Sequence, residues 1–185
     1  MSSIHPPIHF CSQCGSPVTR LIPVGDTLPR HVCPECGTIH YQNPKMVVGC
    51  IAEWEGRILL CRRAIEPRLG LWTLPAGFME NDETTDAAAA RETREEACAE
   101  VAIGQLFALV NIPHIHQVHL FYTGRLTDGQ HAAGEESLDS RLFDECDVPW
   151  DDMAFRSVSF ALRAWFADRR QGCFGLHTTD LAPLP

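Results

Sequence analysis

Acidic residues gather in one short stretch of the sequence, where small residues separate them. The segment Gly77–Glu100 reads GFMENDETTDAAAARETREEACAE and holds eight acidic residues. If a helix begins near Thr84, whose hydroxyl can cap it, then Glu92, Glu95 and Glu96 project within a sector about 100° wide. These carboxylates span only about 6 Å along the axis and repel one another unless a cation neutralises them. A divalent metal site is therefore one interpretation of the pattern.

A solvated acidic helix face is the alternative, because glutamate-rich helices are common on protein surfaces. Arg91 and Arg94 would then be the charge partners of the glutamates. The opposite face carries the small residues Ala90, Thr93 and Ala97, which predict close packing of the helix on a sheet.

Two CxxC pairs near the N-terminus form a second set of residues suited to metal binding. A glycine follows each pair, at Gly15 and Gly37, and 18 residues separate the pairs. This spacing predicts a structural zinc site with four thiolate ligands and no coordination position left open for water. The alternatives are two disulfides or a redox pair, which lack the expected secretion signal and thioredoxin-like context. The four predicted zinc ligands are Cys11, Cys14, Cys33 and Cys36.

Composition narrows the classes of protein and partner. The 185 residues carry a formal net charge of −9, which disfavours nucleic acid as a partner because such binding depends on clustered Lys and Arg. No apolar run is long enough to cross a membrane, and the first residues lack the apolar core of a signal peptide. Five further cysteines, scattered without a pairing pattern, suit a reducing compartment. We therefore expect a cytoplasmic protein without a membrane segment.

The elements that would position these residues follow from periodicity. The X-Pro step at Asn43-Pro44 predicts a boundary between a zinc module, residues 1–42, and a larger domain, residues 43–185. In the larger domain, alternating apolar runs predict a β-rich fold that also has two helices, one of them carrying the glutamates. The predicted elements outside that helix are strands at 46–54 and 57–62, which form a hairpin, strands at 101–110, 118–126 and near 140–143, and a helix at 155–169.

The glutamate segment resembles the Nudix box of hydrolases that act on nucleoside diphosphates linked to another moiety. The matching string is Gly77, five residues, Glu83, seven residues, Arg91-Glu92, then Glu95-Glu96. It departs from the family pattern where Cys98 replaces a glycine and where Thr93 and Ala99 replace aliphatic residues. The resemblance to zinc-ribbon Nudix hydrolases, a group that includes the plant chloroplast pyrophosphatase for FAD and ADP-ribose, covers roughly residues 9–170. It rests on the segments FCSQCG, CPECG, YQNPKMVVG, GLWTLPAGF and ESLDSRLF.

This resemblance implies an α+β fold: a Nudix α/β/α sandwich with a mixed β-sheet, preceded by a small four-cysteine zinc ribbon. It implies Mg²⁺ or Mn²⁺ as the catalytic cofactor, bound by Glu92 and Glu96, with Glu95 as a third ligand or as the base. The main-chain carbonyl of Gly77 matches another family ligand, and Glu136 matches a loop glutamate that acts as the base in related enzymes. Many members are homodimers, so a homodimer is the expected assembly here.

Four further side chains receive roles from the same resemblance or from their positions. Glu83 is expected to pair with Arg91, which would hold the loop against the helix, and we prefer this structural role to a catalytic one. Arg62 and Arg63 precede the GLWTLPAG segment and are candidates for contact with a substrate phosphate. The HIHQVH segment suggests metal ligands, but with strand alternation only His114 and His116 would share a face. Polar strand residues near a pocket are the better interpretation.

The implied activity is cleavage of a pyrophosphate bond in a nucleotide substrate, ADP-ribose or FAD, with release of AMP. One alternative is an NADH pyrophosphatase or RNA decapping enzyme, whose SQPWPFP-type segment is replaced here by NIPHIHQVHLFY. A sanitiser of oxidised nucleoside triphosphates is a weaker one. A different class of function is a noncatalytic nucleotide sensor or a zinc-ribbon binding module, although a reader of nucleotides has no need of all three helix glutamates.

Overall fold

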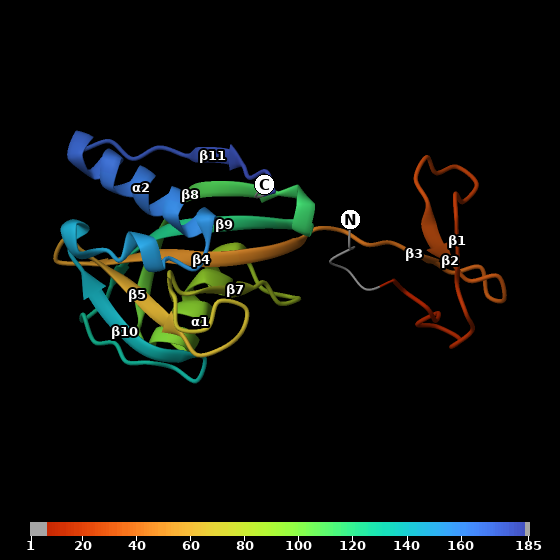
Figure 1. Cartoon of the computed structure of the whole chain (residues 1–185), viewed down its shortest axis with the longest axis horizontal. Helices are drawn as coiled ribbons and strands as arrows, with labels where there is room; N and C mark the ends of the chain where they lie inside the picture. The colour runs from red at the N-terminus through yellow and green to blue at the C-terminus, as the bar shows by residue number, and fades with distance from the viewer. Residues whose placement is uncertain (1–6, 184–185) are drawn as a thin grey trace. The chain divides into compact units, whose positions relative to one another are not determined.

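The computed structural model describes residues 7–183, and the chain divides into two compact units with the boundary between Pro44 and Lys45 (Figure 1). In the first unit, three short antiparallel strands form a sheet in the order β1-β2-β3. Their bounds are Thr19–Leu21 for β1, Arg30–Val32 for β2 and Ile39–His40 for β3.

The second unit is built on one mixed sheet of eight strands. The main path runs β10-β5-β4-β9-β8-β11, while β6 pairs with β5 and β7 pairs with β4. The pairs β4/β9 and β8/β11 are parallel and the other pairs are antiparallel. The strands are β4 (Lys45–Trp54), β5 (Arg57–Arg63), β6 (Trp72–Thr73), β7 (Ala76–Phe78), β8 (Val101–Ile112), β9 (Gln117–Leu126), β10 (Ser137–Phe143) and β11 (His177–Asp180).

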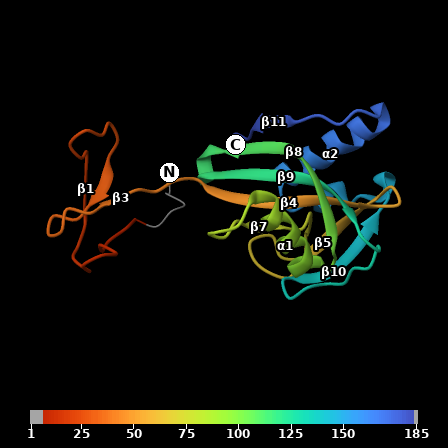
Figure 2. The same cartoon turned by 180° about the vertical axis from the view of Figure 1, so that it is seen from behind.

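Helices α1 (Thr85–Ala97) and α2 (Arg156–Gln171) cover opposite faces of this sheet (Figures 1 and 2). The small residues of α1 share one hydrophobic cluster with β4, β5 and β8, and the apolar stripe of α2 belongs to a second cluster. The α/β/α sandwich that the resemblance implied is therefore confirmed. Three single-turn 3₁₀ helices complete the unit: η1 (Pro113–Ile115), η2 (Glu145–Asp147) and η3 (Trp150–Asp152).

Most of the predicted elements are present, with shifts of one to three residues. The hairpin of β4 and β5 turns at Glu55-Gly56, and the hydroxyl of Thr84 caps α1 by accepting a hydrogen bond from the Ala87 N–H at 3.4 Å. The two-residue strand β6, the three-residue strand β7 and the C-terminal strand β11 escaped prediction, because such short segments carry too few residues for a periodic pattern.

The expectation that strand alternation relates His114 to His116 is wrong. His114 lies in η1, and His116 caps that turn with a left-handed φ of 55°. Pro113 supplies no N–H for continued strand pairing and has a φ suited to a helical turn, so the chain leaves β8 there.

The end of α1 shows how the chain does without the family's usual glycine. Cys98 adopts the left-handed conformation, with φ of 48°, and its N–H donates to the carbonyl of Arg94 at 2.9 Å. The turn is kept, at a cost of about 1 kcal/mol for a residue that has a Cβ. Thr93 is buried, and its hydroxyl donates to the carbonyl of Ala89 at 2.8 Å.

Within the described residues, neither helix is both long enough and apolar enough to pass through a lipid bilayer.

Candidate active site

A cavity of about 1190 Å³ lies where α1, β7, η1 and the N-terminal end of α2 approach one another. Four acidic side chains of the predicted site line it: Glu92, Glu95, Glu96 and Glu136. Gly77, Arg91 and Arg63 line it too, whereas Glu83 and Arg62 do not belong to its lining. Most of the residues that sequence patterns singled out thus meet around one hollow.

Glu92 and Gly77 are fitted to each other. A Cβ placed on Gly77 would lie 2.5 Å from the carboxyl carbon of Glu92, so the carboxylate occupies the space that any side chain at position 77 would need. Gly77 is held in place by pairing with Val48 of the central strand β4. Glycine at this position therefore lets a helix carboxylate and a strand backbone share one corner of the cavity.

Glu96 is a buried carboxylate with one main-chain partner. Its Oε2 accepts a hydrogen bond from the Ala76 N–H at 3.0 Å, and only 6% of the residue is exposed. Burial, together with the nearby charges of Glu92 and Glu136, raises the pKa of Glu96 to about 7. Burial also raises the pKa of Glu92 above its ordinary value. These pKa shifts indicate that the pair lacks full charge compensation within the protein.

Arg91 holds the loop before α1 against the helix. Its guanidinium donates two hydrogen bonds to Glu83, at 2.7 and 3.0 Å, so the predicted salt bridge is present and bidentate. The other arm of the guanidinium donates to Glu92 at 2.7 Å and to Glu95 at 3.0 Å. The pKa of Glu83 falls to about 2 because of these hydrogen bonds from Arg91. Arg91 thus orients one carboxylate of the buried pair and leaves Glu96 free of it.

Glu95 and Glu136 approach the cavity from its solvent side, and both are exposed. Glu136 directly precedes β10, and its carbonyl accepts a hydrogen bond from the Ala64 N–H at 2.8 Å. The loop before it is docked on α1: the N–H groups of Ala132 and Gly134 donate to the carbonyls of Ala97 and Glu96, at 2.8 and 3.0 Å.

Gly134 is a site-positioning residue that sequence reasoning missed. A Cβ at this position would overlap the carbonyl oxygen of Glu95 and lie 2.8 Å from its carbonyl carbon. In the sequence this segment is only a polar, glycine-containing loop. No local pattern predicts that its backbone N–H groups cap the C-terminal carbonyls of a helix. This docking brings the end of the loop, with Glu136, beside the carboxylate helix.

The two arginines predicted to contact phosphate occupy different environments. Arg63 is 9% exposed, lines the cavity, donates from Nε to the carbonyl of Pro67 at 3.0 Å and lies over the ring of Phe155. Arg62, at the preceding position of β5, is exposed, and its Nε donates to the carbonyl of Gly70 at 2.8 Å. Strand alternation separates them, so only Arg63 faces the carboxylates.

His119 is a further cavity residue, and no sequence signal separates it from its neighbours. Its Nδ1 lies 2.9 Å from the hydroxyl oxygen of Ser157 on α2, and its Nε2 lies 2.9 Å from the side-chain oxygen of Gln117. Burial lowers the pKa of His119 to about 4, so the imidazole is neutral at physiological pH. The ring ties β9 to the start of α2.

The four predicted zinc ligands converge in the first unit. All four Sγ atoms lie within 4.8 Å of one another, and each cysteine is a free thiol. Gly15 and Gly37 adopt left-handed conformations, with φ of 75° and 73°, that close the two knuckles. The donor set fits Zn²⁺, which favours four thiolates in tetrahedral geometry. The disulfide alternative finds no support in this arrangement, where two pairs of sulfurs are 3.5 and 3.6 Å apart.

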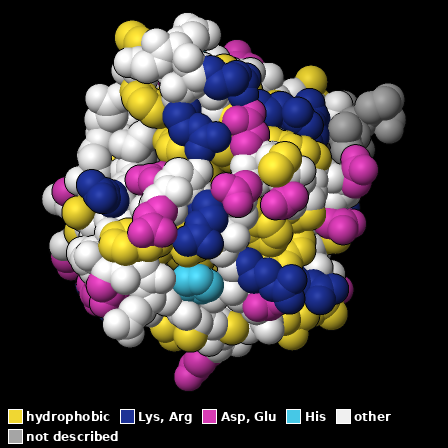
Figure 3. Space-filling view, turned by 90° about the vertical axis from the view of Figure 1, so that its left-hand side faces the viewer, with side chains coloured by type: hydrophobic (Ala, Val, Ile, Leu, Met, Phe, Trp, Pro, Cys, Tyr) yellow, Lys and Arg dark blue, Asp and Glu magenta, His cyan; other side chains and the backbone are white. Residues whose placement is uncertain are grey.

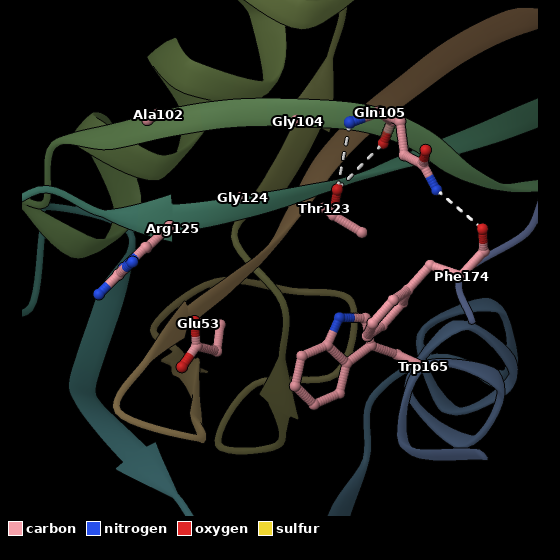
Figure 4. A pocket seen from close by; sticks show the side chains of 9 residues that line it. All are labelled: Glu53, Ala102, Gly104, Gln105, Thr123, Gly124, Arg125, Trp165 and Phe174. Carbon is pink, nitrogen blue, oxygen red and sulfur yellow. Dashed lines mark hydrogen bonds between the residues drawn. The ribbon is translucent and has the colours of Figure 1, made fainter. Parts of the chain in front are cut away.

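A second hollow, of about 470 Å³, lies between the β8/β9 strands and the C-terminal end of α2 (Figure 4). Trp165 and Phe174 form its aromatic side, facing the bare backbone of Gly104 and Gly124. Of its described lining residues Glu53 alone is acidic, and that carboxylate already accepts a hydrogen bond from the Gly56 N–H at 2.5 Å. The larger cavity is therefore the candidate active site.

Two protein-family models match the chain. The model described as "Nudix N-terminal" matches residues 9–42, and the model described as "NUDIX domain" matches residues 43–166, which is more than half of the chain. A crystal structure of a NUDIX hydrolase from Nitrosomonas europaea is 52% identical, with a TM-score of 0.89, over 94% of this chain and 100% of that one.

Curated relatives include an ADP-ribose pyrophosphatase, NAD-capped RNA hydrolases and a CTP pyrophosphohydrolase. The ADP-ribose pyrophosphatase of Methanocaldococcus jannaschii is 28% identical over 113 residues, which cover 59% of this chain and 67% of that protein. The NAD-capped RNA hydrolase NudC of Pseudomonas aeruginosa is 29% identical over 167 residues, which cover 88% of this chain and 57% of that protein. The chain thus spans little more than half of the NudC protein.

Proposed function

Because this chain belongs to the NUDIX hydrolase family, we propose that it hydrolyses the pyrophosphate bond of a nucleoside diphosphate linked to another moiety. ADP-ribose and FAD are the proposed substrates, and AMP is the common product, released with ribose 5-phosphate or FMN. The proposal follows from the two buried carboxylates, the cavity beside them and the names of relatives.

The observation that carries the proposal is the pair Glu92 and Glu96, buried side by side on one helix and facing a large cavity. Burying two carboxylates costs folding free energy unless a cation compensates them. Of this pair Arg91 reaches only Glu92, and the remaining uncompensated charge is what a divalent ion would neutralise. A protein that bound nucleotides only through stacking and hydrogen bonds would have no use for this arrangement.

The residues fit Mg²⁺ or Mn²⁺, since both ions prefer carboxylate and carbonyl oxygens. We assign Glu92 and Glu96 as ligands, with Glu95 as a third and the main-chain carbonyl of Gly77 as a fourth. A bound divalent ion supplies charge neutralisation at the pyrophosphate oxygens and lowers the pKa of a coordinated water. Arg63, on the same cavity wall, is positioned to hold a phosphate oxygen by its guanidinium.

The proton of the attacking water must pass to a carboxylate at the cavity. Glu95 and Glu136 are the two candidates that the family resemblance suggests, and both line the cavity, are exposed and lack a main-chain N–H partner in the described structure. Glu95 already accepts a hydrogen bond from Arg91 at 3.0 Å, so the guanidinium occupies one of its carboxylate oxygens. We therefore favour Glu136, with Arg91 and Glu83 as positioning residues.

Similarity to NudC supports a second candidate, hydrolysis of NADH or of NAD-capped RNA. This similarity includes the first unit, because the match to the Pseudomonas aeruginosa protein covers 88% of the chain. Charge argues against a long nucleic acid: the net charge is −9, and on the face shown in Figure 3 basic side chains are interspersed with acidic ones. Nucleotide substrates need no extended basic surface.

One assay separates these candidates. Purified protein is incubated with ADP-ribose, FAD, NADH, an NAD-capped oligonucleotide and ATP under one Mg²⁺ condition and one Mn²⁺ condition, and AMP release is quantified. We expect the highest kcat/KM for ADP-ribose or FAD. A preference of tenfold or more for NADH or the capped oligonucleotide, about 1.4 kcal/mol in transition-state free energy, would move the assignment to the second candidate.

Homodimer formation stays a prediction of the family resemblance, and a cytoplasmic location stays a prediction from the composition. Light scattering and fractionation of cells would test them.

A further inference from the structure

The C-terminal segment 173–183 lies beyond the part of the chain that the NUDIX domain model matches, yet it is tightly built into the fold. Its strand β11 extends the sheet in parallel with β8, from His177 opposite Ala108 to Asp180 opposite Asn111. A tight hairpin cannot join two parallel strands, and here the chain passes from β8 through β9, β10 and α2 before it reaches β11.

Both ends of this segment are anchored by specific hydrogen bonds. At its start, the buried carboxylate of Asp168 on α2 accepts from the Gly175 N–H at 3.0 Å and lies 2.8 Å from Nε2 of His177. At its end, Asn111 Nδ2 donates to Asp180 Oδ1 at 2.8 Å. The position of the segment on β8 is therefore determined by side chains, in addition to strand pairing.

The residues after β11 turn toward the candidate active site. The Leu181 N–H donates to the carbonyl of Asn111 at 2.8 Å, and Arg156 at the start of α2 donates to the carbonyl of Ala182 at 2.8 Å. These bonds place Leu181 and Pro183 in the lining of the large cavity. The chain's last described residues thus form part of its wall.

This wall differs in chemistry from the carboxylate end. Leu181 packs against the core cluster of α2, and Ile112, Ile115 and Phe155 line the cavity with it. The carboxylates belong to α1, which packs on β4 and β7, and β11 lies three strand positions away from β4. At about 4.8 Å per position, that is a distance of about 14 Å across the sheet. The strand that leads into Leu181 is thus well separated from the strand under the carboxylates, whereas Phe155 lies nearer to them, beneath Arg63. An apolar wall with one aromatic member suits a flat ring system.

We propose that the C-terminal residues Leu181 and Pro183 form a subsite for the aromatic base of the nucleotide and so help determine substrate specificity. The inference rests on the proposed function, because it takes the phosphates to lie at the carboxylate helix. In this proposal, Leu181 and Pro183 contact the base and lower the KM for the substrate, while cleavage of the pyrophosphate bond depends on residues of α1.

The test compares two products of the proposed reaction, AMP and ribose 5-phosphate, of which only AMP carries the adenine base. Calorimetry in Mg²⁺ measures the Kd of each for the full-length wild-type protein and for Leu181→Ala, Pro183→Ala and the control Thr178→Ala. Thr178 is an exposed β11 residue outside the cavity lining. Pro183 is exposed, so its substitution keeps the test open if Leu181→Ala lowers the Tm.

We expect Leu181→Ala to weaken AMP binding about tenfold, the lower end of the range for lost methylene contacts in a hydrophobic pocket, and Pro183→Ala to weaken it about twofold. Ribose 5-phosphate binding should not change, and Thr178→Ala should alter neither. Equal weakening for both ligands, no weakening for AMP, or no AMP binding by the wild-type protein would each overturn the subsite. The proposed function fails by a different result, absence of AMP release from every dinucleotide in the panel.

Discussion

The cysteine cluster of the first unit and the carboxylate cluster of the second differ in what surrounds them. Among the described residues of the first unit, the buried ones are Cys11, Pro23 and Cys33, whereas the second unit has two extensive hydrophobic clusters. Two of the four predicted zinc ligands thus make up most of the buried core of this unit. In the second unit an independent core holds Glu92 and Glu96 in positions that cost folding free energy.

Metal binding therefore has opposite relations to stability in the two units. In the ribbon, the free energy of metal binding becomes folding free energy, because few other groups hold the strands together. In the second unit, we expect the two hydrophobic clusters to hold the fold without an ion, and a bound ion to offset the cost of burying the two carboxylates. The following predictions test this contrast, beginning with the largest expected effect.

Loss of zinc should unfold the ribbon and leave the second unit folded. Cys33→Ser removes a buried ligand, and the free energy lost is on the order of 10 kcal/mol. Elemental analysis should fall from about one zinc per chain to none, while backbone NMR signals should broaden or collapse for residues 7–44 only. The control Cys146→Ser alters an exposed thiol of the second unit and should keep its zinc. A folded, zinc-free ribbon would contradict the contrast.

Glu96→Gln should reduce kcat at least about 100-fold, since an isosteric amide keeps the shape and removes a metal-binding charge. Glu92→Gln should act in the same way. The matched control is Glu100→Gln, an exposed carboxylate just after the same helix that pairs with Arg94. Turnover is measured on ADP-ribose at saturating Mg²⁺, with circular dichroism to check the fold. Near wild-type rates in either variant would show that the ligand assignment is wrong.

Gly77→Ala should weaken Mg²⁺ binding by about 10- to 100-fold, the range seen when the support of a metal ligand is removed. The added methyl group takes the space of the Glu92 carboxylate and turns that side chain away, and the strand itself has no need to move. Gly175→Ala is the control, because a Cβ there meets nothing within 4 Å. The Mg²⁺ dependence of the rate is the measurement, and an unchanged Mg²⁺ midpoint would refute the close fit.

The contribution of Glu96 to the stability of the second unit without Mg²⁺ should decrease as pH rises from about 4.5 to about 7. It is measured as the difference between the wild type and Glu96→Gln, because the lowered pKa of His119 changes stability with pH in the opposite direction. In this range the folded protein holds a proton on Glu96, whose pKa is raised to about 7, while the unfolded chain has lost it. The folded state therefore binds more protons, and the contribution, on the order of 1–3 kcal/mol, is present below pH 4.5 and lost above pH 7. Urea unfolding of the zinc-loaded protein measures it.

The variant Glu96→Gln should lack this pH-dependent term and should be more stable than the wild-type protein at pH 8 without Mg²⁺. Added Mg²⁺ should stabilise the wild type and not the variant, since ligand binding to the folded state alone raises the free energy of unfolding. If the wild type gains stability between pH 4.5 and 7 relative to the variant, the buried carboxylate does not carry the assigned cost of burial.

The smallest effect is expected at the end of α1. Cys98→Gly should stabilise the protein by about 0.5 kcal/mol, because relief of the left-handed backbone exceeds the entropy that glycine adds to the unfolded chain. Cys98→Ala keeps the Cβ and should bring no gain. Thermal unfolding of the wild type and both variants is the measurement. Equal Tm values for the wild type and Cys98→Gly would mean that the turn is unstrained.

Local spacing sufficed to predict much of this protein. The CxxC pairs predicted the thiolate cluster, and the Thr84 hydroxyl ahead of the glutamates predicted where α1 begins. Both patterns depend on residues a few positions apart, whose relative directions follow from backbone geometry alone. The burial of these side chains did not follow from local spacing. The sequence of the helix alone does not show that Glu92 and Glu96 are buried while Glu95 is exposed.

The amino-acid sequence was enough to predict which groups can bind metal ions, because donor types and their spacing within a knuckle or a helix are local properties. The burial, the charge neighbours and the pKa values of those groups depend on the tertiary structure. The docking of the Gly134 loop, the His119–Ser157 link and the approach of Leu181 to the cavity join segments separated by tens of residues. Such contacts arise from sheet order and layer packing, which single-segment periodicity does not encode, and they set the pKa of Glu96 and the walls of the cavity.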